Sequence, residues 1–294
     1  MLLKYKKKDM IPQSNLKPSG INRNLTLKSI KKFQNSIYEY YKKNKRRLPY
    51  RSTNNPYYIL VSEIMLQQTQ VDRVNDKYLL FIKEFPNFKA LADAPGSDLL
   101  RVWQGLGYNR RALALQRTAQ IIVKQYHGKL PDSVDELVKL PGIGSYTAAA
   151  ICAFAFNKPV VVIETNIRTV FIHFFFHDRT QVKDDELLPL IEKTLDKKKT
   201  KEWYYALMDY GVMLKKNLPN PGRKSAHYYK QSKFEGSNRQ LRGRILKALV
   251  AKHRVSEDEL YSGTKANKAT IRKNLMQLEQ EGFIKRNKNI ISLA

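Results

Sequence analysis

Apolar residues recur at intervals of three and four positions through most of the first two thirds of the chain, which is the spacing of amphipathic helices. One such run ends at Gly128, a typical helix stop. Its apolar face consists of Leu115, Ala119, Ile122 and Tyr126. No stretch from about 28 to 215 alternates between apolar and polar residues over any length. The pattern therefore predicts an almost wholly helical region.

A second pattern fills positions 239–294, after a polar and basic connector. Three short amphipathic segments precede two strand-like segments that turn at Asn287–Asn289. We expect the second helix to begin at Ser256, because Glu259 three positions later completes a capping box. This order predicts a small winged helix-turn-helix domain, whose third helix typically enters the major groove of DNA. A protein-docking module with the same elements is the alternative.

Charge narrows the choice of partner. The chain of 294 residues carries 54 lysines and arginines against 26 acidic residues, a net charge of +28. Such an excess favours a polyanion, and nucleic acid is favoured over membrane because no long apolar helix is present. A solvated basic surface is the alternative. With 42% hydrophobic residues the chain can bury a substantial core, which argues against global disorder.

The single cysteine, Cys152, excludes a disulfide framework, a four-thiolate zinc site and a cysteine-ligated iron–sulfur cluster. It lies in the apolar run AAAICAFAF, so we expect a small core residue rather than a nucleophile. The first ten residues lack the apolar segment of a signal peptide, and the longest apolar stretches are too short to span a bilayer. These observations predict a soluble intracellular protein, cytoplasmic and associated with the nucleoid.

The stretch LPGIGSYTAAA breaks one helical pattern and restarts another at once. Gly142 and Gly144 flank a single isoleucine, and glycine tolerates the positive φ angles of a tight turn. We expect Ser145 to cap the new helix, and the N–H groups of all three residues to point outward beside its N-terminus. Such an arrangement binds a DNA phosphate without reading a base. An ordinary helical corner is the alternative for this motif taken alone.

Further motifs accompany this hairpin. A second Gly-x-Gly lies at Gly105 and Gly107. Two further stretches are NPYYILVSEIMLQQTQV (55–71), which contains the very specific string SEIMLQQTQV, and WQGLGYNRRA (103–112). Together they resemble the helix-hairpin-helix (HhH-GPD) DNA glycosylase superfamily over about residues 30–215, and within it the adenine glycosylases of the MutY type rather than endonuclease III. The resemblance implies an all-α core of two helical lobes with a cleft between them. The expected parts are a basic flexible tail (1–27), this core (28–222), a basic linker (223–238) and the winged domain (239–294).

Removing adenine requires the base to leave the DNA stack and to receive a proton as it departs. The resemblance implies that the glutamate of SEIML, Glu63, is this general acid. A carboxyl group holds a proton near neutral pH only where burial raises its pKa above the usual ~4.3, so we expect Glu63 to be buried. Without its context, Glu63 is better explained as an acid near the start of a helix, where the helix dipole favours it.

The family places an aspartate beside the sugar, where its charge stabilises the oxocarbenium-like transition state. This chain has Glu164 at that position, in VVVIETNIRTV, and the additional methylene shifts the carboxylate. Two outcomes are open. Glu164 acts with a rearranged geometry, assisted by Asn166, or the enzyme is weakened or serves another purpose.

Other positions extend the predicted site. Bifunctional relatives carry a nucleophilic lysine directly after the hairpin, where this chain has Tyr146. We therefore expect a monofunctional enzyme without strong AP-lyase activity, with Tyr146 as a supporting group of the pocket. Gln67, Gln68 and Tyr108 match family residues that enter the base stack. Helix surface for the glutamines and core packing for the tyrosine are the alternatives.

Further DNA contacts are expected from Thr147, beside the hairpin, and from Lys273, on the third helix of the winged domain. Lys215 stands where the family has the first of four cluster cysteines, so no cofactor is expected, although the hairpin could hold a monovalent cation. The winged domain stands where the family has a module that reads 8-oxoguanine.

The sequence thus predicts a monomeric base-excision-repair enzyme that removes adenine opposite 8-oxoguanine or guanine from mismatched or damaged double-stranded DNA. One alternative is a mismatch glycosylase for thymine or uracil opposite guanine. Another is a non-catalytic DNA-binding lesion sensor or regulator.

Overall fold

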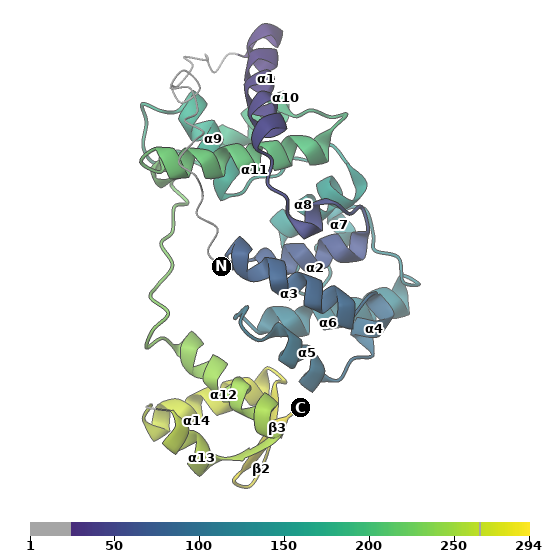
Figure 1. Ribbon diagram of the computed structural model, residues 1–294, viewed down its shortest axis with the longest axis vertical. Coiled ribbons are helices and arrows are strands. Elements are labelled where there is room, and N and C mark those ends of the chain that lie inside the picture. The colour runs from purple at the N-terminus through teal and green to yellow at the C-terminus, as the bar shows by residue number, and fades with distance from the viewer. Residues whose placement is uncertain (1–24, 265) are drawn as a thin grey trace. The chain divides into compact units, whose positions relative to one another are not determined.

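The computed structural model describes residues 25–264 and 266–294, and the predicted tail lies outside this part of the chain except for its last three residues (Figure 1). Contacts divide the chain into two compact units. The first unit consists of the residues up to Arg47 together with Asn157–Tyr229. The second consists of Leu48–Phe156 together with Lys230–Ala294. Each unit is therefore built from two segments that are far apart in the sequence.

The first unit is helical and packs around aromatic rings. Phe33 lies edge-on to four other rings, at centroid distances of 5.1–5.8 Å, and edge-to-face contacts of this kind stabilise a core beyond simple burial. Helix α11 packs against both α9 and α1. The elements are α1 (Leu27–Asn44), α9 (Thr165–Phe175), α10 (Asp184–Thr194), α11 (Thr200–Asn217) and the short 3₁₀ helix η3 (Pro221–Lys224).

Two apolar helices form the centre of the first segment of the second unit. Helix α2 is buried without interruption from Ile59 to Met65, and α8 is buried from Thr147 to Phe154. A helix without a polar face belongs in a core, and α2 accordingly packs against α3, α6 and α8. The elements are η2 (Pro49–Arg51), α2 (Pro56–Leu66), α3 (Val71–Glu84), α4 (Phe88–Ala92), α5 (Gly96–Trp103), α6 (Arg110–Gln125), α7 (Val134–Leu137) and α8 (Ser145–Phe156).

The second segment of this unit contains three helices and a three-stranded antiparallel sheet of order β1-β3-β2. The predicted hairpin is confirmed, because β2 and β3 pair up to Asn287 and Ile290. Strand β1 was not predicted, since three residues are too few to show a period. The elements are α12 (Asn238–Lys252), β1 (Arg254–Ser256), α13 (Glu257–Gly263), α14 (Lys268–Gln280), β2 (Ile284–Asn287) and β3 (Ile290–Leu293).

These C-terminal elements share a core with the rest of their unit. Their buried residues, among them Ile245, Leu275 and Phe283, form one cluster that also includes Leu100 of α5, and α12 packs against α5. The predicted capping box is confirmed at Ser256, whose hydroxyl accepts a hydrogen bond from the N–H of Glu259 while that side chain accepts one from the N–H of Ser256.

Several other predictions are confirmed. All strands in the described part of the chain lie beyond residue 253, and α6 ends before Gly128, whose φ is +76°. Leu115, Ala119 and Ile122 are buried, and so is Cys152. Among the helices of residues 25–264 and 266–294, none is both long and apolar enough to cross a membrane.

Candidate active site

Glu63 lies on α2, and its residue is 8% exposed, which confirms the expected burial. The alternative, an acid near the start of a helix, is wrong. Helix α2 begins at Pro56, where the side chain of Asn55 accepts a hydrogen bond from the N–H of Tyr57, and Glu63 is the eighth of its 11 residues. The dipole at that end of a helix disfavours a negative charge, so it gives no reason for a carboxylate there.

Arg111 holds the C-terminal end of α2. Its Nη1 donates to the carbonyl oxygens of Ile64 and Met65 at 2.9 and 2.8 Å, and its Nη2 donates to that of Gly107 at 2.9 Å. Burial lowers the pKa of Arg111 to about 10, so the side chain stays cationic at neutral pH. No sequence motif had marked Arg111 as part of the site, although it stands one helical turn before Leu115 on the buried face of α6.

The hairpin between α7 and α8 needs glycine at one of its two positions. Gly142 has a φ of +76°, and a Cβ there would lie 2.9 Å from the Cβ of Ala114. Gly144 does not have a positive φ. Its carbonyl accepts the N–H of Ala148 at 2.9 Å, so Gly144 is the helix cap, and Ser145 is the first helical residue rather than the cap. Gly144 and Ser145 are both exposed, at the start of a 12-residue helix.

Gln67 ties the helix that carries Glu63 to this hairpin. Its Nε2 donates to the carbonyl of Gly142 at 3.2 Å and to Oγ1 of the buried Thr147 at 3.1 Å. Gln68 is exposed and has a φ of +54°, an uncommon conformation for a residue with a Cβ. Both glutamines lie beyond the last residue of α2, so routine helix surface does not describe them. Tyr146, near the start of α8, is 36% exposed.

Tyr108 is half-buried and has a φ of +48°. Its hydroxyl accepts a hydrogen bond from Nη1 of Arg239 at 2.6 Å and another from Nε2 of Gln231. The guanidinium groups of Arg239 and Arg111 lie 5.4 and 5.5 Å from the centre of its ring. The ring is therefore held by cations and an amide, rather than packed in an apolar core.

A cavity of about 1050 Å³ adjoins Tyr108 within the second unit. Its lining also includes both glutamines, and the described residues that line it include no acidic side chain. Amides, a flat ring and cations are groups that contact a nucleic-acid strand. The cationic residues of the lining are Arg73, Lys77, Arg110, Arg111, Arg239, Arg242 and Lys247.

In the first unit, Glu164 is the N-cap of α9. Its Oε1 accepts the N–H groups of Asn166 and Ile167 at 2.7 and 2.9 Å. Its Oε2 accepts the hydroxyl of Thr165 at 3.0 Å and the side-chain amide of Asn166 at 3.1 Å. The carboxylate therefore folds back onto the start of its own helix, and the positive end of the helix dipole favours its charge.

Two side chains of α11, neither of them predicted from the sequence to belong to the site, hold the segment around Glu164. The hydroxyl of Tyr204 donates to the carbonyl of Val160 at 2.8 Å and accepts the N–H of Val162 at 3.0 Å. Nζ of Lys215 donates to Oδ1 of Asn166 at 2.9 Å. No local sequence pattern predicts either contact, because each joins residues more than 40 positions apart.

The remaining predicted contacts are placed as follows. Lys273 is exposed on α14. Within the part of the chain that the structure describes, no three histidine, cysteine or acidic side chains converge as metal ligands. The predicted monovalent cation at the hairpin stays a prediction, as do the catalytic and DNA-binding roles of the residues named above.

Comparison with known proteins adds a family and several relatives. Residues 61–194 match the family described as "HhH-GPD superfamily base excision DNA repair protein". The chain is 38% identical over 183 residues to the adenine DNA glycosylase of Buchnera aphidicola subsp. Baizongia pistaciae, covering 62% of this chain and 52% of that protein. It is 41% identical over 136 residues to the adenine DNA glycosylase of Mycobacterium tuberculosis, covering 46% of this chain and 45% of that protein.

The chain thus spans about half the length of these curated relatives. Among solved structures, it is similar to a thermostable thymine-DNA glycosylase, with a TM-score of 0.56 and 26% identity. That likeness covers 63% of this chain and 87% of the other.

Proposed function

We propose that this chain, whose residues 61–194 belong to the HhH-GPD superfamily of base excision DNA repair proteins, hydrolyses the N-glycosidic bond of adenine in mismatched DNA. The adenine would lie opposite 8-oxoguanine or guanine. The names and the 38–41% identity of the adenine DNA glycosylases above support the choice of base.

The observation that carries the proposal is the burial of Glu63 on a helix joined to the hairpin through Gln67. Burial favours the protonated form of a carboxyl group, which is the form that a general acid needs. In the proposed reaction, Glu63 gives its proton to the departing adenine, whose negative charge would otherwise make it a poor leaving group.

Glu164 supplies the complementary charge. As adenine departs, positive charge develops on the sugar, and a fixed carboxylate stabilises it without reorganising. The four hydrogen bonds that Glu164 accepts from Thr165, Asn166 and Ile167 support a carboxylate held in one orientation.

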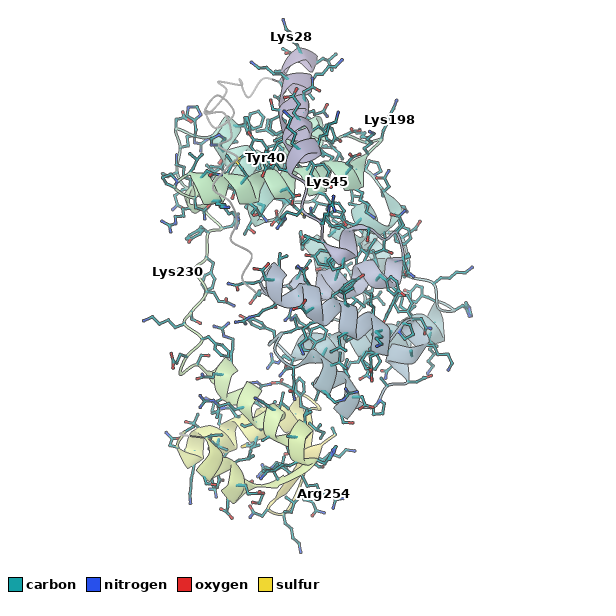
Figure 2. The ribbon with its side chains drawn as sticks, viewed as in Figure 1. Lys28, Tyr40, Lys45, Lys198, Lys230 and Arg254 are labelled. Carbon is teal, nitrogen blue, oxygen red and sulfur yellow. The ribbon has the colours of Figure 1, made fainter. Side chains whose placement is uncertain are left out.

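In this proposal the second unit supplies contacts that bind DNA. Exposed amides at Gly144 and Ser145 suit a phosphate, and the cationic cavity beside Tyr108 suits the backbone and bases of a strand. We assign a winged-helix role in DNA binding to α12, α13, α14 and their sheet, with Lys273 on its third helix. Figure 2 shows further basic side chains at the surface, among them Lys230 on the connector and Arg254 at the start of β1.

A single-turnover assay tests the acid. We expect Glu63→Gln to slow adenine release from an A·8-oxoguanine duplex by about 10²–10⁴-fold, because the amide has no proton to give. The matched control is Glu192→Gln, which changes an exposed glutamate of α10 and should leave the rate unchanged. Equal rates for Glu63→Gln and the wild type would remove the acid role.

A second candidate is the excision of thymine or uracil opposite guanine, which the likeness to a thymine-DNA glycosylase favours. A panel of mismatched duplexes with product analysis separates the two candidates by the base released. Gel electrophoresis of the same reaction products shows whether the DNA strand has been cleaved. With Tyr146 at the lysine position of the bifunctional relatives, we expect an intact strand with an abasic site and no adduct trapped by borohydride.

A further inference from the structure

A chain of polar contacts joins α11 to the carboxylate of Glu164. Lys215 donates to Oδ1 of Asn166 at 2.9 Å, and Nδ2 of the same amide donates to Oε2 of Glu164 at 3.1 Å. All three side chains belong to the first unit and are half-buried. Burial lowers the pKa of Lys215, and the charge of Glu164 opposes this shift.

The packing of the two helices places Lys215 here. Gly211 lies one turn before it on the same face of α11, and a Cβ at Gly211 would be 2.4 Å from the backbone oxygen of Asn166. The absence of a side chain thus lets α11 approach the start of α9 closely, and the next residue on that face reaches the amide of Asn166.

The hydrogen-bonding capacity of the three side chains fixes the orientation of the Asn166 amide. A carboxylate only accepts hydrogen bonds, and a lysine ammonium only donates them. An amide placed between them has one favourable orientation, with its oxygen toward Lys215 and its NH₂ toward Glu164. Without the lysine, the amide could rotate and present its oxygen to the carboxylate, which would remove one of the four hydrogen bonds of Glu164 and add a repulsion.

We propose that Lys215 is a positioning residue for the proposed base excision, acting through Asn166 to fix the carboxylate of Glu164 where the sugar develops its charge. This role rests on the proposed function. In this role Lys215 acts through the amide of Asn166, which its Nζ contacts, rather than by a hydrogen bond to the carboxylate.

The test compares Lys215→Met, Lys215→Arg and the matched control Lys216→Met, which changes the exposed neighbouring lysine. We expect Lys215→Met to lower the single-turnover rate of adenine release about tenfold or more while the dissociation constant for the duplex stays within about twofold, since a small misplacement of a catalytic group affects the chemical step. Lys215→Arg keeps donors at this position and should restore most of the rate.

A double-mutant cycle separates positioning from a general structural effect. Asn166→Asp keeps an acceptor for Lys215 and removes the donor to Glu164, so it should slow the reaction about as much as Lys215→Met does. The double variant should then be no slower than either single variant, because both break the same chain. Asn166→Asp also serves as the second variant if Lys215→Met does not fold.

Three results would overturn the role of Lys215. They are a Lys215→Met rate equal to that of Lys216→Met, a Lys215→Arg rate as low as that of Lys215→Met in folded protein, and additive losses in the cycle. The failure of the proposed function looks different: the wild type itself would release no base from any duplex, and the positioning role would fall with it.

Discussion

At the scale of single residues, the candidate site depends on charges whose partners are mostly neutral groups. Arg111 donates hydrogen bonds to carbonyl oxygens at the C-terminal end of α2 and in the turn at Gly107, and one to the hydroxyl of Thr69. The carboxylate of Glu164 is held by N–H and O–H donors in the same way. Neutral partners hold such a side chain in place without neutralising its charge, which leaves that charge available to a substrate.

Replacing Arg111 tests how much these hydrogen bonds contribute to the stability of the fold. Arg111→Met would leave the partly buried carbonyls of Ile64 and Met65 without this donor, and such acceptors are costly to leave unpaired. We expect a loss of about 2–3 kcal/mol in the free energy of unfolding, measured by urea denaturation. Arg117→Met, on the exposed face of the same helix, should stay within about 0.5 kcal/mol of the wild type. An unchanged midpoint for Arg111→Met would contradict this account.

At the scale of elements, the position of Glu164 is decided by the contact between α9 and α11. This contact depends on Gly211, because the atoms of Asn166 occupy the space that a side chain there would need. Tyr204 lies farther along α11 toward its N-terminus and anchors the segment that leads into α9. A helix of the first unit thus sets both the approach to the N-cap and the orientation of its carboxylate.

Gly211→Ala tests this contact. The new Cβ would lie 2.4 Å from the backbone oxygen of Asn166, so the helices must separate. We expect a destabilisation of about 1–3 kcal/mol, seen as a lower melting temperature by circular dichroism, together with slower base release.

The matched control for Gly211→Ala is Gly243→Ala on α12, where a Cβ meets nothing within 4 Å. Its expected effect is neutral or a stabilisation of up to about 1 kcal/mol, because alanine is the better helix former. Gly211→Ala melting at or above the temperature of Gly243→Ala would show that the close approach is not required.

At the scale of the whole molecule, the net charge of +28 is spread over both units. Figure 2 shows basic side chains such as Lys28 and Lys198 in the first unit and Arg254 in the second. A charge of this size attracts DNA over a distance set by the salt concentration. In the proposed function this charge would contribute affinity for DNA, while discrimination between bases would come from contacts inside the site.

Salt titration measures this contribution. If the protein neutralises six to ten phosphates, its affinity for a duplex should fall about 10³–10⁵-fold between 50 and 200 mM salt. Lys273→Met should reduce the slope of log K against log salt by about 1, as measured by fluorescence anisotropy. Lys89→Met is the control, because Lys89 already contacts Asp93 at 2.8 Å. An unchanged slope for Lys273→Met would remove α14 from the DNA interface.

Sequence patterns predicted what depends on neighbours along the chain. The helical period placed Leu115, Ala119 and Ile122 in the core, and the turn at Asn287–Asn289 between two strand-like segments predicted the hairpin. The spacing of Ser256 and Glu259 predicted a helix start. Periods, caps and turns involve residues only a few positions apart, so a linear sequence displays them directly.

Tertiary structure alone decided which of these residues meet. It distinguished Gly142, which needs a positive φ, from Gly144, which does not. It brought Lys215 to Asn166 across 49 positions and Arg239 to Tyr108 across 131. Contacts between distant residues depend on how whole helices pack. The spacing of side chains along the chain does not reveal these contacts, because the same spacing also occurs on solvent-exposed helix faces.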